Sequence, residues 1–270
     1  MSRFKRVALI KAHQKLEPPN HTFTSDLTEI AHLGAFIEND VEYVTMPVGP
    51  YDKMPFKKFE ESLIRERFDF VGISAMTGGY NNAREFARVA RQAGAFVTMG
   101  GYHPTALTDD VLADPNVDAI IRGEGEVTLR DLVVNGPSKD VLGLSYKENG
   151  EQIHNPDRPL IEDLDTLPFP LRKIRPTRFG EPGDQYSMDT IYSSRGCIAK
   201  CTFCANDTMN KSLRNRSPEH FVAELETLHD PRVKKVLKFW DSIFLFDPDR
   251  VEKIIQLMFK KNLTNFRLIT

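Results

Sequence analysis

The chain has 270 residues, of which 40% are hydrophobic, and a formal net charge of −2 at pH 7. This length allows two domains that each bury a core, and the charge balance excludes a global basic bias toward nucleic acid. The three cysteines are too few for a disulfide framework and suit a reducing cytoplasm, and no segment approaches the length of a membrane span.

The first 140 residues alternate short apolar runs with amphipathic stretches. The pattern predicts strands over residues 7–10, 42–46, 70–74, 96–99 and 119–121, and helices over residues 26–38, 57–67 and 82–92. Strands that alternate with helices form βαβ units. We therefore expect an α/β fold with a doubly wound parallel sheet, whose ligands bind at the carboxyl ends of the strands.

Loops rich in glycine follow three of these expected strands, over residues 74–80, 100–105 and 122–126. Glycine permits positive φ and a close approach of backbone to ligand, but it is also an ordinary turn residue. Each loop alone is therefore weak evidence for a binding site. The candidate cofactor-binding residues in these loops are Ser74, Met76, Thr77, Gly100, Gly101, Gly123 and Glu124.

The pattern changes between residues 141 and 185. Two short strands, over 144–147 and 152–154, flank a turn at Asn149-Gly150 and predict a hairpin. Six prolines then space out a connector that cannot be helical throughout. They are Pro156, Pro159, Pro168, Pro170, Pro176 and Pro182. We therefore expect three segments: a first domain over 1–140, a hairpin and linker over 141–185, and a second domain over 186–270.

The second domain is expected to continue the alternation of strand and helix. We predict strands over 190–193 and 233–240, a third strand from near Phe266, and helices over 218–229 and 248–261. Ser217 should cap the first of these helices, because it directly precedes a proline at the first helical position. The loop after the first strand contains every cysteine of the chain, namely Cys197, Cys201 and Cys204.

This cysteine loop predicts a metal cluster. Separations of four and three residues let one loop turn three sulfurs toward one point, while no fourth cysteine is present to close a tetrahedral zinc site. Lys200 and Thr202 between the cysteines disfavour a packed core, and the nearest downstream histidine, His220, lies in an expected helix. An iron-sulfur cluster with one open iron is favoured over the two alternatives, structural zinc and apolar packing.

The segment from Cys197 to Cys204 resembles the CxxxCxxC signature of radical S-adenosylmethionine (SAM) enzymes, with Phe203 as the aromatic residue before the last cysteine. The resemblance implies that the three thiolates hold three irons of a 4Fe-4S cluster and that SAM binds the fourth. Reduction of the cluster would then cleave SAM to a 5'-deoxyadenosyl radical. It also implies that the backbone near Phe203 lies close to the adenine of SAM.

Family members contact the amine of SAM at the end of the second strand, often through a GGE motif that this chain lacks. Asp241 corresponds to that position and is the candidate by position only. A helix-capping or surface role for Asp241 is the alternative. His103, His220 and His229 have no partner at metal spacing, so we expect them to be surface or structural residues.

The glycine-rich loops together resemble the cobalamin-binding domain that precedes the radical SAM domain in one large class of these enzymes. Its SxL and GG elements correspond to residues 74–76 and to Gly100-Gly101, and residues 164–170 resemble its LDxLPxP linker. The third element, DxHxxG, is missing, although His13 and His21 lie in the expected region. The resemblance therefore implies cobalamin without a histidine below the cobalt. A vestigial fold that binds no corrinoid is the alternative.

The resemblance implies a cytoplasmic, cobalamin-dependent radical SAM enzyme of unknown substrate, served by a flavodoxin- or ferredoxin-type reductant. Its reaction would be methyl transfer to an unactivated carbon, or a related cyclisation or rearrangement. Family barrels have six βα units and about three are expected here, so the resemblance implies an incomplete (β/α) barrel in a truncated enzyme that cleaves SAM poorly. A non-catalytic iron-sulfur scaffold is the alternative, and tRNA methylthiolation is disfavoured because no cysteine precedes Cys197.

Overall fold

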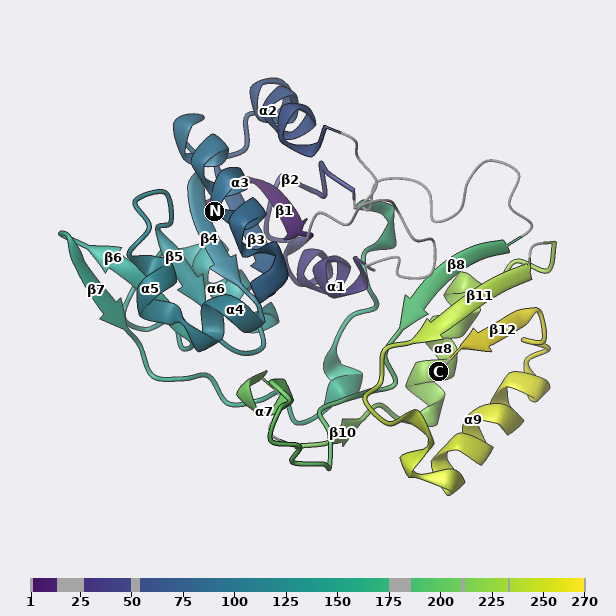
Figure 1. The fold of residues 1–270 in the computed structure, drawn as a ribbon. Coiled ribbons are helices and arrows are strands. Elements are labelled where there is room, and N and C mark those ends of the chain that lie inside the picture. Colours follow the sequence, from purple (N-terminus) through teal and green to yellow (C-terminus); the bar gives the residue numbers. More distant parts are fainter. Residues whose placement is uncertain are drawn as a thin grey trace. The chain divides into compact units, whose positions relative to one another are not determined.

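The computed structural model describes residues 2–13, 27–49, 54–174, 186–209, 212–232 and 234–269. The chain divides into two compact units (Figure 1). The first comprises residues 1–160 and 170–176, and the second comprises residues 161–169 and 177–270. The expected helix start at Asp26, together with His21, Pro176 and Pro182, lies outside the described residues.

The first unit is built on a seven-stranded sheet with the order β2-β1-β3-β4-β5-β6-β7. Its first five strands are parallel to one another, as predicted for a doubly wound fold, and their order 2-1-3-4-5 is one of the common doubly wound orders. They are β1 (Arg6–Ala12), β2 (Tyr43–Thr45), β3 (Phe70–Ala75), β4 (Phe96–Gly100) and β5 (Ala119–Ile121).

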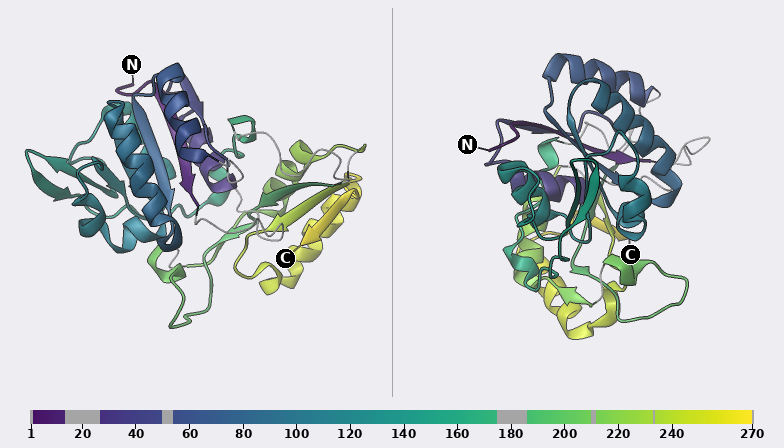
Figure 2. Two further views of the ribbon diagram at one scale, coloured as in Figure 1. Left: turned by 45° about the horizontal axis from the view of Figure 1, so that its top comes forward. Right: turned by 90° about the vertical axis from the view of Figure 1, so that its left-hand side faces the viewer.

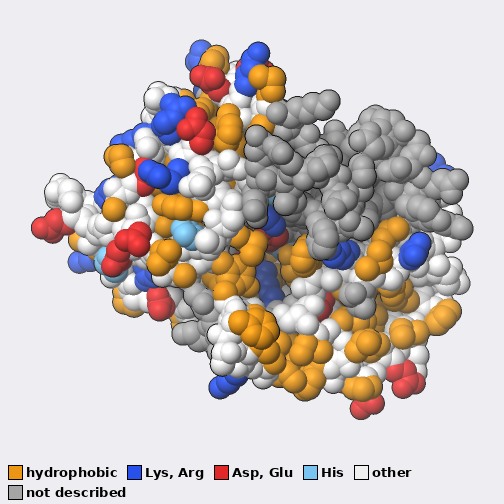
Figure 3. Space-filling model, viewed as in Figure 1, with side chains coloured by type: hydrophobic (Ala, Val, Ile, Leu, Met, Phe, Trp, Pro, Cys, Tyr) orange, Lys and Arg blue, Asp and Glu red, His pale blue; other side chains and the backbone are white. Residues whose placement is uncertain are grey.

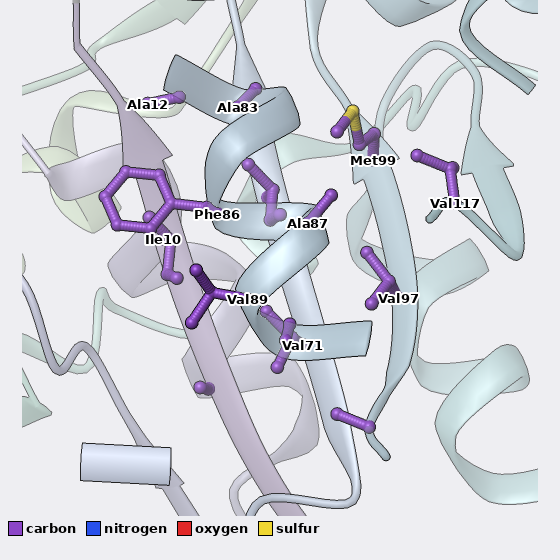
Figure 4. Packing of buried hydrophobic residues seen from close by; sticks show 14 of the residues in the cluster. Ile10, Ala12, Val71, Ala83, Phe86, Ala87, Val89, Val97, Met99 and Val117 are labelled. Atoms are coloured by element: carbon purple, nitrogen blue, oxygen red, sulfur yellow. The ribbon is translucent and has the colours of Figure 1, made fainter. Parts of the chain in front are cut away.

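Helices cover both faces of this sheet (Figure 2). Alternate residues of β1 point to opposite faces, so that Ile10 packs into one core and Leu9 into the other. We call the core that contains Ile10 the first core and the core that contains Leu9 the second core. In the first core, Phe86 and Ala87 lie over the sheet (Figure 4). The helices are α1 (Thr28–Ile37), α2 (Pro55–Glu66), η1 (Thr77–Gly79), α3 (Tyr80–Gln92), α4 (Tyr102–Ala106), α5 (Thr108–Leu112) and α6 (Glu126–Asn135).

Helices α4, α5 and α6 were not predicted. The first two have five residues each, too few to show helical periodicity, and α6 follows the loop around Gly123 and Gly125 directly. Three helices that line the two cores, α2 and α3 on one face and α1 on the other, were predicted within two residues at each end wherever the structure describes those ends. Their apolar periodicity explains this result.

The hairpin expected in the linker is attached to the first sheet. Its strands, β6 (Leu144–Glu148) and β7 (Glu151–His154), pair antiparallel, and β6 pairs antiparallel with β5. This pairing buries Leu144 and Tyr146 in the second core. Arg122 secures the hairpin, because its guanidinium donates to the Ser145 hydroxyl and the Asn155 carbonyl. Domain boundaries at 140 and 185 stay a prediction.

The second unit contains a parallel three-stranded sheet in the order β12-β11-β8. The pattern of strand, helix and strand confirms the predicted start of a partial (β/α) barrel. Its core includes Ile191, Phe221, Leu237 and Ile254. Other hydrophobic side chains lie on the surface of the molecule, as the orange atoms in Figure 3 show. The main elements are β8 (Tyr186–Ile191), α8 (Pro218–Leu228), β11 (Lys234–Phe239), η4 (Phe244–Phe246), α9 (Pro248–Lys260) and β12 (Phe266–Ile269).

Both long helices of this unit begin with a side-chain cap. The Ser217 hydroxyl accepts from the His220 N–H at 3.1 Å, which confirms the predicted cap of α8. The Asp247 carboxylate accepts from the Arg250 N–H at 3.0 Å and caps α9. Across the residues that the structure describes, no helix has both the length and the apolar character needed to span a bilayer.

Candidate functional site

The glycine-rich loops of the first unit meet at one edge of the sheet. In the strand register, Ala12 of β1 pairs with Ala75 of β3, Ser74 of β3 with Gly100 of β4, and Gly100 with Ile121 of β5. Because these strands are parallel, the loops that follow them emerge side by side at their carboxyl ends. The structure thus brings the three predicted loops together.

Side-chain contacts join these loops to one another. His103 Nδ1, on α4, lies 3.2 Å from the Thr77 hydroxyl, and the His103 and Tyr80 ring centroids are 4.1 Å apart. The Gly123 N–H donates to the Thr105 hydroxyl at 3.2 Å, which links the loops after β4 and β5. The edge is therefore a connected surface rather than a set of independent turns.

Two of the predicted glycines have different structural roles. Gly101 has a φ of 96°, and a Cβ there would lie 2.9 Å from the Ala75 carbonyl oxygen, so its glycine is required by packing against β3. Gly123 also has positive φ, at 71°, but a Cβ there would meet nothing within 4 Å. Close packing therefore explains Gly101 without a ligand, whereas the space around Gly123 is open.

The remaining candidates at this edge are accessible to different degrees. Met76 is 58% exposed and Thr77 is also exposed, whereas Ser74, Gly100 and Glu124 are half-buried. An exposed thioether beside hydroxyl groups and backbone at glycine positions suits a large ligand with apolar and polar parts. These residues fit the nucleotide tail of a corrinoid.

Burial lowers the pKa of both histidines at this edge. The pKa of His13, at the end of β1, falls to about 4 because of burial and the nearby Lys11 charge. The pKa of His103 is lowered mainly by burial. His103 is buried between the loops, in keeping with the structural role expected for it. Both imidazoles are therefore neutral at pH 7.

The cysteine loop of the second unit has a fixed base. The short strands β9 (Ser194–Arg195) and β10 (Arg214–Asn215) pair antiparallel on either side of it. Gly196 has a φ of 89°, and a Cβ there would lie 2.0 Å from the Ser212 carbonyl oxygen. Only glycine fits at position 196, where the backbone passes close to Ser212. The backbone next to the first cysteine therefore has little conformational freedom.

The thiols of this loop are free and accessible. Cys197 is half-buried, while Cys201 and Cys204 are exposed. In the described part of the chain, no three His, Cys, Asp or Glu side chains gather closely enough to hold a metal ion, so the sulfurs do not converge here. Phe203 has 90% of its side chain exposed. Three accessible thiols within eight residues nevertheless form a donor set that fits three irons of a cluster.

Asp241 lies at the carboxyl end of β11, and its side chain is directed to the segment before the cysteines. Its carboxylate accepts from the N–H and hydroxyl of Ser193 and from the hydroxyl of Ser194. The cap of α9 is Asp247, so the helix-capping alternative for Asp241 is wrong. Its proposed contact with the amine of SAM stays a prediction.

Sequence reasoning missed two arginines beside the cysteine loop. Arg216 is 6% exposed and donates to the Tyr192 carbonyl at 2.8 Å, and Arg250 donates to the Ser193 carbonyl at 2.6 Å. Their only sequence signal is that Arg216 directly precedes the capping Ser217 and that Arg250 falls in the first turn of α9. That signal does not identify a partner 24 or 57 residues away.

The amino-acid sequence is similar to a known family and to a known protein. Residues 24–133 match the family model described as the B12 binding domain. The chain is 32% identical over 236 residues to "Uncharacterized methyltransferase PH0819" from Pyrococcus horikoshii, a match that covers 82% of this chain and 50% of that protein.

Solved structures share the fold of the whole chain. The radical SAM methyltransferase TsrM from Kitasatospora setae, solved with cobalamin and a [4Fe-4S] cluster, superposes with a TM-score of 0.74 at 16% identity, covering 98% of this chain and 54% of TsrM. OxsB, a cobalamin-dependent SAM radical enzyme solved with aqua-cobalamin and SAM, gives a TM-score of 0.71 at 21% identity, covering 96% and 37%.

These likenesses define the class of fold. The chain has the architecture of radical SAM enzymes of the cobalamin-binding-domain class, with a B12-binding domain followed by strands and helices of a radical SAM barrel. The chain spans about half the length of the Pyrococcus horikoshii relative and of TsrM.

Proposed function

We propose that this chain carries the cobalamin and cluster sites of a radical SAM enzyme that transfers a methyl group to an unactivated carbon. The observation that carries the proposal is the position of all three cysteines in one loop after β8, downstream of a B12-binding domain. Two similar proteins, PH0819 and TsrM, are named methyltransferases, which supports methyl transfer.

Cys197, Cys201 and Cys204 would hold three irons of a 4Fe-4S cluster, and the backbone near Phe203 would lie beside the adenine of SAM. When bound and reduced, the cluster supplies the electron that cleaves SAM to a 5'-deoxyadenosyl radical. The chain's own contribution is to keep the thiols accessible on a fixed base, through the β9 and β10 pair and Gly196.

The corrinoid would bind at the carboxyl edge of the first sheet. Ser74, Met76 and Thr77 would contact its nucleotide tail after β3, and the backbone at Gly100-Gly101 would approach it after β4. Gly123 and Glu124 would border the same site, since space is open around Gly123. The exposure of Met76 and Thr77 supports this assignment.

The enzyme would work in a reducing cytoplasm and take its electron from a flavodoxin- or ferredoxin-type protein. The support is chemical, because exposed thiols such as those of Cys201 and Cys204 stay reduced only in such a compartment.

Anaerobic reconstitution with iron and sulfide tests the cluster. We expect about four irons per chain and charge-transfer absorption in the visible range. Cys201→Ala should lose most of the iron and the absorption, whereas Lys200→Ala in the same loop should keep both. Stoichiometric zinc uptake without iron would contradict the proposal, because three thiolates and one open position would then hold a different metal.

A further inference from the structure

The cysteine loop is joined to β8 by a short stem, residues 192–194, whose polar groups bind side chains from other elements. The strand was expected to continue to Ser193, but β8 ends at Ile191. Ser193 is fully buried and Ser194 is 4% exposed. Buried backbone and hydroxyl groups need partners, and those of the stem have partners in three other segments of the chain.

The carboxylate of Asp241 satisfies one side of the stem. Its two oxygens accept from the Ser193 N–H at 3.0 and 3.2 Å, and Oδ1 also accepts from the Ser193 hydroxyl at 2.6 Å and the Ser194 hydroxyl at 2.5 Å. Hydrogen bonds to an ionised acceptor are shorter and stronger than neutral ones. One side chain from the end of β11 thus orders two consecutive stem residues.

Two guanidinium groups satisfy the opposite side. The Ser193 carbonyl accepts from Arg250 Nη2 at 2.6 Å and from the Arg216 N–H at 2.9 Å. Arg216 Nη1 also donates to the Tyr192 carbonyl and to the carboxylate of Glu224, which is fully buried on α8. The stem is therefore held by residues of α9 and of the segments that follow β11 and precede α8.

The stem lies three residues before the first cysteine. Ser194 begins β9, and the Ser212 carbonyl restricts the backbone at Gly196. A displacement of the stem would therefore also displace Cys197. A cluster needs its three sulfurs within a narrow geometry, and the groups that orient the ligands affect metal affinity. The stem's position therefore bears directly on the placement of the thiols.

We propose that Asp241 is a positioning residue that fixes the stem of the cysteine loop, and that this, rather than contact with the amine of SAM, is its role. The inference rests on the proposed cluster at Cys197, Cys201 and Cys204. Among the residues that the structure describes, the hydrogen bonds to the Asp241 carboxylate come from the two stem serines. Asparagine cannot replace it, because an amide NH₂ would face at least one of these donors.

The test compares Asp241→Asn, Ser193→Ala and the double variant with wild-type protein. The first readout is amide hydrogen exchange of the peptide containing residues 192–195, measured without iron. We expect exchange about tenfold or more faster in both single variants, because Ser193→Ala removes one charge-assisted hydrogen bond of the stem and Asp241→Asn removes the charge from all of them. The double variant should be no worse than the singles, because both changes disrupt the same interaction.

The second readout is the cluster itself, measured without SAM. Iron content after reconstitution should fall, and the electron paramagnetic resonance (EPR) spectrum of the reduced cluster should change, in both single variants. Asp230→Asn is the matched control. Asp230 accepts three hydrogen bonds from Arg232, at 2.9 and 3.0 Å, on the surface of the same unit, and its loss should leave both readouts unchanged.

Two results would overturn the inference. One is unchanged exchange at the stem in both variants. The other is Asp241→Asn protein with wild-type iron content and EPR spectrum but weaker SAM binding, which would identify an amine ligand. Wild-type protein that takes up no iron would instead overturn the proposed function, and the exchange measurement would still decide whether Asp241 holds the stem.

Discussion

His13 shows how a single residue's charge depends on its surroundings. Its side chain is half-buried at the end of β1, and its carbonyl accepts from the Asn82 side chain at 2.5 Å. Burial and the Lys11 charge lower its pKa from 6.5 to about 4. The unfolded chain therefore binds a proton at a higher pH than the folded protein does.

We expect this difference to make the protein less stable in acid. The stability that neutral His13 contributes is fully present above pH 6.5 and is lost as the pH falls toward 4, by at most about 3 kcal/mol. Urea midpoints at pH 7, 5.5 and 4.5 measure this dependence. The His13→Asn variant should lose less stability as the pH falls. If the wild-type protein and the variant showed the same pH dependence, another group would be responsible for the loss of stability in acid.

Substitutions of single residues at the proposed corrinoid site should change the affinity for cobalamin. Gly101→Leu should block the cofactor sterically, but the position has positive φ and close backbone contacts, so the variant would also disturb the fold. Met76→Glu is cleaner, because Met76 is exposed. A charge there should weaken hydroxocobalamin binding by roughly tenfold or more, since an apolar contact would become a desolvated carboxylate.

Titration of the purified protein, followed by absorbance, measures this binding. Ile64→Glu on α2 is the matched control, because Ile64 is 74% exposed and lies near the helix end remote from the carboxyl edge. His13→Ala should also keep the affinity, because no DxHxxG element is present to supply a cobalt ligand. Loss of binding in His13→Ala would mean that this histidine reaches the cobalt.

At the scale of elements, one buried ion pair links α8 to the segment before it. Arg216 and Glu224 are 6% and 0% exposed, and the Arg216 guanidinium also lies 5.8 Å from the Phe169 ring. Breaking a buried pair from one side leaves an uncompensated charge. Glu224→Leu should therefore lower the free energy of unfolding by about 3 to 5 kcal/mol.

Adding Arg216→Met to Glu224→Leu separates the charge from the hydrogen bonds. It should recover part of the loss by removing the buried charge, but not all of it, because the Tyr192 carbonyl would lose its donor. Urea unfolding of the wild-type protein and of the single and double variants measures this. Full recovery in the double variant would show that the Tyr192 contact contributes nothing to stability.

The same helix binds the linker. The Asp165 carboxylate, in η2 (Leu164–Thr166), accepts from the Ser217 N–H at 2.9 Å and lies 3.4 Å from His220 Nδ1. The pKa of His220 is lowered mainly by burial and then by Arg216, while Asp165 acts in the opposite direction. His220 is thus a structural residue, as expected, and residues 161–169 are part of the second unit.

At the scale of the whole molecule, the residues that the structure describes form separate hydrophobic cores, two in the first unit and one in the second. We therefore expect two calorimetric transitions. Hydroxocobalamin should raise the midpoint of one and the reconstituted cluster the midpoint of the other, because a ligand stabilises the unit that binds it. Anaerobic scanning calorimetry with each cofactor alone measures both shifts. A single transition raised by either cofactor would show that the units unfold together.

The sequence by itself determined the local features of this protein. The main strands and helices follow from apolar periodicity, and the cap at Ser217 follows from its place before a proline. The cysteine spacing and the small residues after β3 and β4 predicted the two candidate sites from local patterns of the same kind. Each signal depends on residues within a few positions of one another.

Only the tertiary structure decided which distant residues meet. Asp241 and Ser193 are 48 positions apart, and Arg250 and Ser193 are 57 apart, so no local pattern pairs them. The hairpin joins the first sheet because β5 offers an edge to Leu144 and Tyr146, and His13 stays neutral because the fold buries it. Hydrogen-bond partners and desolvation are properties of the assembled chain, since they depend on what surrounds a group in space.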